Sequence, residues 1–239
     1  MTQRRIRAVL FDMDGLTLDT ESIGYIAYLR AGKKFGFQVN DRLHMDLGGR
    51  TEPEIIAELK RVFGDDKDIV GWRSYINSQK DVILHERGRA GKKPGLLELL
   101  CYLNEMKIPY ALASSTRQEK IRELLATEYL VHAFPIIVSG DMVTHGKPDP
   151  EIFQVAASRL NVDPSEALVL EDARAGIEAA HGGGFQSAFI FDDVSKYGTL
   201  DDGYPMLVNL PDPLDAGLLA NYKPHDLGEV VTIIKQANS

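Results

Sequence analysis

The most constraining feature of this sequence is a series of short apolar runs, each followed directly by small, polar or acidic residues. Five runs share this pattern: Ala8–Phe11, Tyr110–Ala113, Ile136–Val138, Ala167–Leu170 and Ser187–Phe191. They lack the regular apolar and polar alternation of a half-exposed strand, which is typical of strands that are buried on both faces. The pattern therefore predicts a sheet that is covered by helices on both sides.

Helical periodicity fills the segments between these runs from residue 95 onward. Apolar residues recur at helical spacing over residues 96–103, 121–125, 152–160 and 175–180. Strands that alternate with helices in this way predict a parallel sheet with right-handed crossovers. The expected fold class is α/β, with a Rossmann-like parallel sheet as the core.

Residues 20–90 interrupt this alternation with three successive helical patterns, Tyr25–Phe35, Thr51–Phe63 and Val70–Leu84. We interpret them as a helical cap inserted after the first strand. The core would then comprise residues 1–18 plus 95–239, and the cap residues 19–94. Ligands of open α/β sheets bind beyond the carboxyl ends of the strands. An insertion that leaves from this edge would cover the site as a lid.

Composition narrows the class of protein and partner. The 239 residues are 44% hydrophobic and 26% charged, as in ordinary globular proteins. The net charge of −8 argues against non-specific nucleic-acid binding. Cys101 is the single cysteine, which excludes an intrachain disulfide. Every apolar run is shorter than the roughly 18 residues of a membrane span. We expect a cytoplasmic monomer that binds neither nucleic acid nor membranes.

Chemically capable side chains follow four of the predicted strands. They are Asp12 and Asp14, then Ser114–Thr116, then Lys147 after a short loop, and finally Glu171 and Asp172. Taken singly, each set has an ordinary structural explanation: aspartates in a turn, hydroxyls that cap a helix, a solvated lysine. Because the carboxyl ends of parallel strands meet at one edge, their combination predicts a common site.

This set of side chains suits phosphoryl transfer. A carboxylate can act as a nucleophile and form an acyl phosphate. A lysine and the backbone N–H groups at a helix N-terminus can neutralise the phosphate oxygens. Clustered carboxylates favour a hard cation, here Mg²⁺, which would also relieve the repulsion between nucleophile and phosphate.

Four motifs resemble, in their order and content, those of the haloacid dehalogenase superfamily. They are FDMDGLTLDTE, ALASST, GKPDPEIF and LVLEDARAGIEAA, and together with the inserted cap they extend over nearly the whole chain. The resemblance is to the subgroup with a helical cap after the first strand, which includes phosphosugar phosphatases and β-phosphoglucomutase. It implies a Mg²⁺-dependent phosphatase that acts on a small phosphorylated metabolite, such as a sugar phosphate, through an aspartyl-phosphate.

The resemblance also implies roles for the residues that handle the phosphate. Asp12 would be the nucleophile. Asp14 would protonate the leaving alcohol and then, as a base, activate water. Ser114 would hydrogen-bond the phosphoryl group, Ser115 would help to bind the substrate, and Lys147 would contact the phosphate and Asp12.

The same resemblance implies a metal site and contacts from the cap. Mg²⁺ would be held by Asp12, the backbone carbonyl of Asp14 and Asp172, with Glu171 as a ligand or bound to one of the ion's water molecules. In the cap, Gly49 and Arg50 belong to a loop that would face the core. Arg50 would grip the substrate or lie on the surface, and Glu21 would contact the substrate, support the hinge or be solvated.

Two other functions stay open. One is a phosphosugar mutase like β-phosphoglucomutase, but that enzyme carries a histidine where this chain has Gly24. The other is a catalytically silent module that binds phosphorylated metabolites. Silent members would be expected to lose the nucleophile or the acid/base aspartate, whereas this chain keeps both Asp12 and Asp14. Dehalogenases of the superfamily lack the second aspartate, which argues against that activity.

Overall fold

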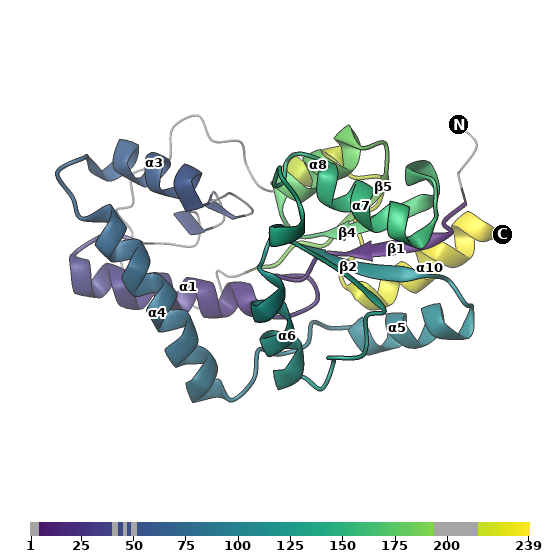
Figure 1. The fold of residues 1–239 in the computed structure, drawn as a ribbon, viewed down its shortest axis with the longest axis horizontal. Helices are drawn as coiled ribbons and strands as arrows, with labels where there is room; N and C mark the ends of the chain where they lie inside the picture. Colours follow the sequence, from purple (N-terminus) through teal and green to yellow (C-terminus); the bar gives the residue numbers. More distant parts are fainter. Residues whose placement is uncertain (1–4, 40–42, 45–46, 49–51, 194–214) are drawn as a thin grey trace.

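The computed structural model describes residues 5–39, 43–44, 47–48, 52–193 and 215–239. A five-stranded parallel sheet with helices on both faces forms one end of the molecule, and a separate group of helices forms the other (Figure 1). The strands are β1 (Ala8–Phe11), β2 (Tyr110–Ser114), β3 (Ile136–Ser139), β4 (Ala167–Glu171) and β5 (Gln186–Phe189).

The order of the strands in the sheet is β3-β2-β1-β4-β5, which places β1 in the centre. All neighbouring strands are parallel, and Phe11 at the end of β1 lies opposite Leu112 of β2 and Leu170 of β4. The segments that follow β1, β2 and β4 are therefore adjacent at one edge. The predicted α/β class with a parallel sheet is confirmed, and each predicted strand is found with small shifts of its ends.

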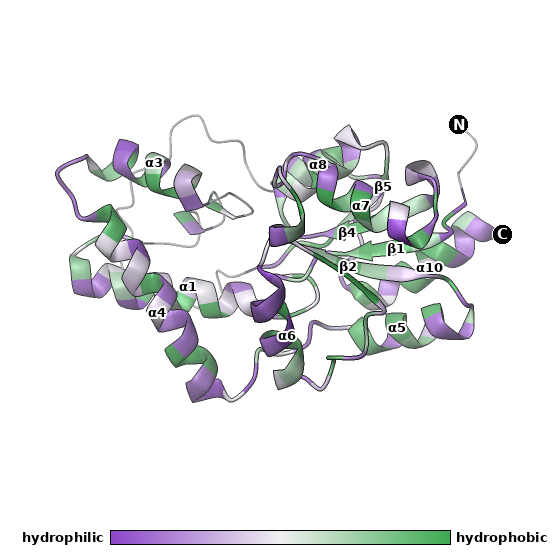
Figure 2. Ribbon diagram, viewed as in Figure 1, coloured by the Kyte–Doolittle hydropathy of each residue, from purple (hydrophilic) through white to green (hydrophobic). Residues whose placement is uncertain are grey.

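Helices cover both faces of the sheet because both faces are apolar. On one face, Val9 and Phe11 pack in a core with residues of α5 (Leu96–Glu105), α6 (Gln118–Thr127) and α10 (Leu227–Asn238). On the other face, Ala8 and Leu10 pack with α7 (Glu151–Leu160) and α8 (Arg174–Gly182). Figure 2 shows the hydrophobic strands between helices whose outer sides are polar. Alternate residues of one strand thus serve two cores.

In the part of the chain that the structure describes, the group that we call the cap contains α1 (Thr20–Phe35), α3 (Glu52–Phe63) and α4 (Ile69–Arg87). Its interior is built around Trp72, which is fully buried. The indole ring stacks on Phe37 with 4.4 Å between ring centroids and meets Phe63 and Tyr28 edge to face. Aromatic rings in this arrangement bury much apolar area and add specific ring contacts. The cap therefore has an apolar interior, which is continuous with the hydrophobic core on the face of the sheet covered by α5, α6 and α10.

The two connections between cap and sheet run side by side. The backbone N–H of Asp19 donates to the carbonyl of Gly91 at 2.9 Å, and that of Lys93 donates to Thr17 at 3.1 Å. The first connection leaves after β1 and the second enters α5, so both pass the carboxyl edge of β1. The division into a core of residues 1–18 plus 95–239 and a cap of residues 19–94 stays a prediction.

The second connection is also tied to the core by side chains. Glu128, just after α6, accepts a hydrogen bond from the backbone N–H of Gly91 at 2.6 Å and from Lys92 Nζ at 2.7 Å. Lys93 Nζ lies 2.6 Å from Asp192 Oδ1, beyond β5. Charge-assisted bonds of this kind are among the stronger hydrogen bonds in proteins. They hold the connection against the sheet at two points.

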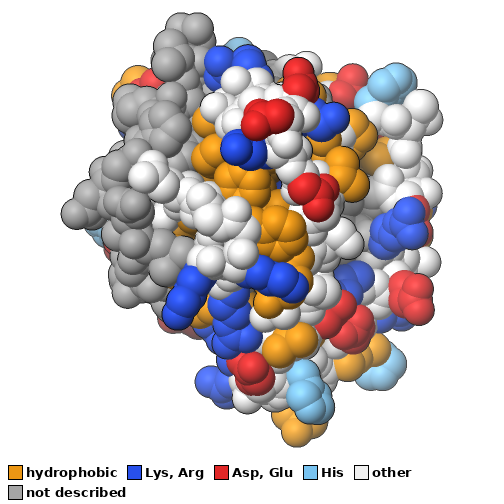
Figure 3. Space-filling model, turned by 90° about the vertical axis from the view of Figure 1, so that its left-hand side faces the viewer, with side chains coloured by type: hydrophobic (Ala, Val, Ile, Leu, Met, Phe, Trp, Pro, Cys, Tyr) orange, Lys and Arg blue, Asp and Glu red, His pale blue; other side chains and the backbone are white. Residues whose placement is uncertain are grey.

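The surface at the cap end mixes residue types. Figure 3 shows a band of hydrophobic side chains with Lys, Arg, Asp and Glu side chains interspersed around it. Within the described ranges, each helix is too short or too polar to cross a lipid bilayer.

Two glycines with the same backbone conformation test how tightly the core is packed. Gly95 and Gly36 have φ values of 76° and 74°, which disfavour any side chain. A Cβ at Gly95 would lie 2.0 Å from the backbone nitrogen of Gly228, whereas one at Gly36 would meet open space among the described residues. Gly36→Ala should lower the free energy of unfolding by about 1 kcal/mol. Gly95→Ala should lower it by at least about 2 kcal/mol more, because α5 and α10 must separate. Urea unfolding would measure both, and equal losses would contradict the packing argument.

Candidate active site

The loop after β1 begins the site. The backbone N–H of Asp12 donates to Leu170 of β4 at 3.0 Å, so the strand pairing extends to the first acidic residue. Asp12 and Asp14 are separated by Met13, whose side chain is fully buried. Gly15 follows with φ of 79°, and a Cβ there would lie 2.0 Å from Asp172 Oδ2. Both its conformation and its surroundings therefore require glycine.

A buried lysine joins the ends of β1 and β4. Lys147 Nζ contacts Asp12 Oδ1 and lies 2.6 Å from Glu171 Oε1. Its side chain is only 4% exposed. Burial would lower the pKa of Lys147, but the charges of Asp12 and Glu171 outweigh this effect and raise it. The lysine is therefore a fixed positive charge beside Asp12.

Three carboxylates converge beside this lysine. Oxygen atoms of Asp12, Glu171 and Asp172 all lie within 4.8 Å of one another. Burial raises the pKa of Asp12 and Asp172 well above the usual range, and repulsion from neighbouring carboxylates adds to the effect. When ionised, the three carry a charge of −3 against +1 on Lys147, which leaves −2 to be neutralised. An all-oxygen site with this charge fits a hard divalent cation.

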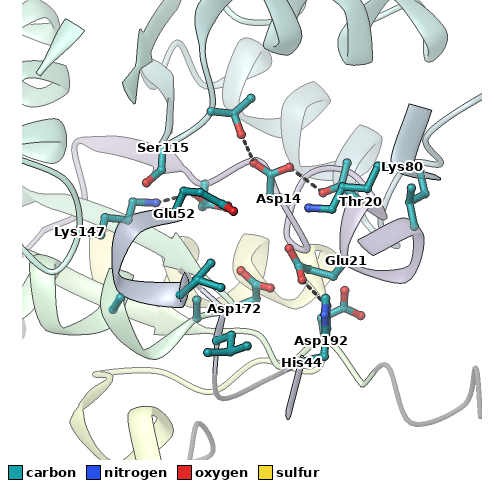
Figure 4. A pocket seen from close by; sticks show the side chains of 18 of the residues that line it. Asp14, Thr20, Glu21, His44, Glu52, Lys80, Ser115, Lys147, Asp172 and Asp192 are labelled. Atoms are coloured by element: carbon teal, nitrogen blue, oxygen red, sulfur yellow. Dashed lines mark hydrogen bonds and ion pairs between the residues drawn. The ribbon is translucent and has the colours of Figure 1, made fainter. Parts of the chain in front are cut away.

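Hydroxyl groups surround the carboxylate of Asp14 (Figure 4). Thr20 Oγ1 donates to Oδ1 at 2.8 Å, and Thr116 Oγ1 and Ser114 Oγ lie 2.8 and 3.2 Å from Oδ2. The interpretation of Ser114–Thr116 as a helix cap is wrong, because Arg117 holds the N-cap position of α6. These hydroxyls bond to Asp14 because β2 lies beside β1 in the sheet.

The cap adds a carboxylate–imidazole pair. Glu21, in the first turn of α1, has Oε2 2.7 Å from Nε2 of His44. Burial would raise the pKa of Glu21, but the hydrogen bond and charge of His44, with the charges of Lys80 and Lys93, outweigh it and lower the pKa to about 2. Glu21 is therefore ionised, and the imidazole N–H donates to it.

A cavity of about 630 Å³ lies between the carboxyl edge of the sheet and the cap. This volume is within the usual range for small-molecule sites, roughly 300–1,000 Å³. Of the residues predicted from the sequence, those that line the cavity are Asp12, Asp14, Glu21, Ser115, Lys147, Glu171 and Asp172. Ser114 is buried and reaches the site through Asp14. Gly49 and Arg50 lie outside the described residues.

The cavity is also lined by residues that were not predicted as site residues, among them Thr20, His44 and Lys80. Thr116, the last of the hydroxyls predicted after the second strand, lines it as well. Thr20 stands inside the motif DTE, so its proximity to the acidic residues was a usable signal. His44 and Lys80 stand in no such motif. They reach the cavity because the cap folds over the sheet edge, which a local pattern does not reveal.

The fold and the site define a class of protein. The central strand of a parallel sheet is followed by two aspartates, and a buried lysine and two further carboxylates lie at the same edge beneath a helical cap. These features define a capped α/β protein that is equipped for phosphoryl transfer. The arrangement can present a carboxylate nucleophile, a fixed cation and a divalent metal to one phosphate group.

The chain belongs to the haloacid dehalogenase-like hydrolase family, whose sequence profile matches residues 9–190. It is 31% identical over 231 residues to a phosphorylated carbohydrates phosphatase of Thermotoga maritima, covering 97% of this chain and 99% of that protein. It is 30% identical over 191 residues to a β-phosphoglucomutase of Bacillus subtilis, covering 75% and 80%. A solved structure from Thermotoga maritima matches with a TM-score of 0.67 and 30% identity, covering 97% and 99%.

These comparisons confirm the predicted family and the phosphatase class of enzyme. The family generally uses a divalent metal, and the convergent carboxylates at the edge of the sheet provide a place for one.

The charge at this site leads to a prediction about stability. Because folding raises the pKa of Asp172, the ionised form opposes folding once the pH exceeds the ordinary value of 3.8. In EDTA at pH 7, Asp172→Asn should therefore be more stable than the wild type by more than about 1 kcal/mol. The difference should shrink toward zero as the pH falls to 3.8. Urea unfolding from pH 4 to 8 would test this, and a variant that is less stable at pH 7 would contradict it.

Proposed function

We propose that this enzyme hydrolyses phosphate monoesters of small hydroxylated metabolites, such as sugar phosphates, with Asp12 as nucleophile and Mg²⁺ as its cation. The observation that carries the proposal is the buried contact of Lys147 with both Asp12 and Glu171 at the wall of the cavity. A relative named phosphorylated carbohydrates phosphatase, 31% identical over nearly the whole chain, supports the substrate class.

Asp12 is suited to attack because its position is fixed before substrate arrives. Lys147 Nζ contacts one carboxylate oxygen, Oδ1, and the backbone N–H of Asp12 is held by β4. In the first step, an Asp12 oxygen forms a bond to phosphorus as the alcohol leaves. In the second step, water attacks the aspartyl-phosphate, and Asp12 and inorganic phosphate are released. Lys147 contributes a positive charge beside the phosphoryl oxygens throughout.

Asp14 would supply the proton to the leaving alcohol and later take one from water. Three hydroxyls hold its carboxylate, and one of them belongs to Thr20 at the start of the cap. Movement of α1 would therefore change the partners of Asp14. We propose that cap closure exchanges one of these hydroxyls for the leaving oxygen of the substrate. The same movement would then both place the acid and keep bulk water out of the site.

The acidic group at the sheet edge would hold the metal. Asp12, Asp172 and the backbone carbonyl of Asp14 would be ligands, and Glu171 would bind the ion or one of its water molecules. When bound, Mg²⁺ would reduce the repulsion between the Asp12 carboxylate and the phosphate. The net charge of −2 in this cluster supports a divalent cation, and its oxygen donors support Mg²⁺ over a softer metal.

Transfer of phosphate to a sugar hydroxyl is the competing function. One relative, 30% identical over 75% of this chain, is named β-phosphoglucomutase. Position 24 is glycine, so it supplies no imidazole to a sugar acceptor. NMR of a reaction started with β-glucose 1-phosphate separates the two activities, since a mutase yields a phosphate isomer and a phosphatase yields free phosphate.

Removal of the nucleophile tests the proposed function directly. Phosphate release should be measured with a panel of sugar phosphates, nucleotides and pseudouridine 5′-phosphate. We expect Asp12→Asn to reduce release by at least about 10³-fold, because no acyl phosphate can form. We expect a reduction of the same size when EDTA is added to the wild type, because the negative charge at the site is then not balanced by a metal ion. Restoration of activity by Mg²⁺ is the control for EDTA. Release by Asp12→Asn at the wild-type rate would refute the mechanism.

The acid role of Asp14 predicts a dependence on the leaving group. Asp14→Asn should reduce kcat for a sugar phosphate by about 10²–10⁴-fold, because an alkoxide is a poor leaving group without a proton. The reduction should be much smaller for p-nitrophenyl phosphate, whose leaving group departs as an anion. The same factor for both esters would contradict the acid role in the first step and would leave Asp14 only its role in hydrolysis of the aspartyl-phosphate, which both esters share.

A further inference from the structure

The imidazole of His44 belongs to the cap, is bonded to a carboxylate at the cavity wall and has no role in the mechanism above. His44 lies in the segment between α1 and α3, and its side chain is 8% exposed. The ring packs against Tyr28 edge to face, with centroids 5.2 Å apart, and against Tyr25 at 5.5 Å. The packing fixes the plane of the ring, and the bond to Glu21 fixes its direction.

Gly24 makes room for this ring. A Cβ built on Gly24 would lie 3.1 Å from Cε1 of His44 and 3.7 Å from Nε2. The first of these distances is tighter than an ordinary van der Waals contact. The helix α1 therefore presents a bare backbone to the imidazole at position 24, one turn after Glu21, and the ring fits over it. Glycine, ring and carboxylate form one packed unit on the cavity side of α1.

Glu21 is held against the catalytic loop by this unit. The point at which Gly15 would carry a Cβ lies 2.9 Å from Cγ of Glu21 and 2.0 Å from Oδ2 of Asp172. Glu21 is thus a close neighbour of the loop that carries Asp12 and Asp14. Figure 4 shows Glu21 bonded to His44 within the same cavity as Asp14 and Asp172.

The chemistry of Glu21 indicates what it binds. An ionised carboxylate only accepts hydrogen bonds, and it has capacity for about four. His44 bonds to Oε2, and the other oxygen keeps acceptor capacity at the cavity wall. In a phosphate ester, the donors that could reach it are hydroxyls of the alcohol part. A site built to bond hydroxyls discriminates strongly against analogues that lack them.

We propose that His44 is a positioning residue that determines specificity: it holds the Glu21 carboxylate so that Glu21 accepts hydrogen bonds from hydroxyls of the leaving alcohol, and it thereby selects polyol phosphates over simple alkyl phosphates. The inference rests on the proposed phosphatase function and names the feature of the substrate that the cap recognises.

Two esters of equal carbon number test the selection, namely glycerol 3-phosphate and n-propyl phosphate. The sugar phosphate that the wild type hydrolyses fastest is added to them. His44→Phe keeps a ring of similar shape and removes the donor, whereas His44→Gln keeps an N–H donor. We expect His44→Phe to lower kcat/KM for the hydroxylated esters about tenfold, mainly through KM, because a bond to a charged group is lost. The value for n-propyl phosphate should change by less than about twofold, and His44→Gln should recover most of the loss.

A double-mutant cycle shows whether His44 acts through Glu21. In a Glu21→Ala background, His44→Phe should cause no further loss of the preference for hydroxylated esters, because the carboxylate that it positions is gone. Circular dichroism and urea unfolding of each variant check that the cap remains folded. Additive losses in the cycle would overturn the positioning role, as would equal losses of His44→Phe on all three esters or no loss on any.

Failure of the proposed function and failure of the inference give different experimental results. If the wild type releases phosphate from none of the esters in the larger panel, the proposed function fails and the inference fails with it. If the wild type is an active phosphatase and the His44 variants keep its preference for hydroxylated esters, only the inference fails.

Discussion

The buried contact of Lys147 with Asp12 and Glu171 is the interaction on which the rest of the site depends. Removing charges from water is costly unless they are paired, so the lysine and carboxylates require one another. Lys147 and Asp12 follow β3 and β1, Glu171 is the last residue of β4, and only the parallel order of the sheet brings the three together. Even so, the carboxylates exceed the available positive charge. Burial, together with repulsion among the excess carboxylates, raises the pKa of Asp12 and Asp172, and the excess negative charge creates the place for a divalent cation.

The cap is connected to this site at the edge of the sheet. Its two connections lie side by side, and Glu128 holds the second one against α6. Thr20, at the start of α1, reaches Asp14, and one residue later Glu21 reaches His44. A single helix turn therefore contacts both the acid/base candidate and the part of the cap that lines the cavity. Chemistry and substrate choice are in this way connected through the first turn of α1.

Prediction from the sequence succeeded where a structural feature depends only on residues that are close together in the chain. The run Ala8–Phe11 must be a buried strand because each of its side chains is apolar, and its place before Asp12 locates the site. The alternative explanation of Ser114–Thr116 as a helix cap does not hold, because hydroxyls before a helix can bond to its N-terminus or to a neighbouring strand's loop, and Thr116 bonds to Asp14. The choice depends on β2 lying next to β1, which is a tertiary fact. Gly49 and Arg50 stay predictions, since they lie outside the described residues.

The sequence by itself determined the α/β class, the inserted helices, the family and the acidic and basic residues at the strand ends, because apolar periodicity and motif order are properties of consecutive residues. Only the tertiary structure decided which groups meet. It turned Asp14 toward Thr20 and Thr116, and it seated the imidazole of His44 over Gly24 and against Glu21. These contacts join residues that are 6 to 102 positions apart. Their partners are chosen by the packing of the cap and the order of the strands, which no single segment encodes.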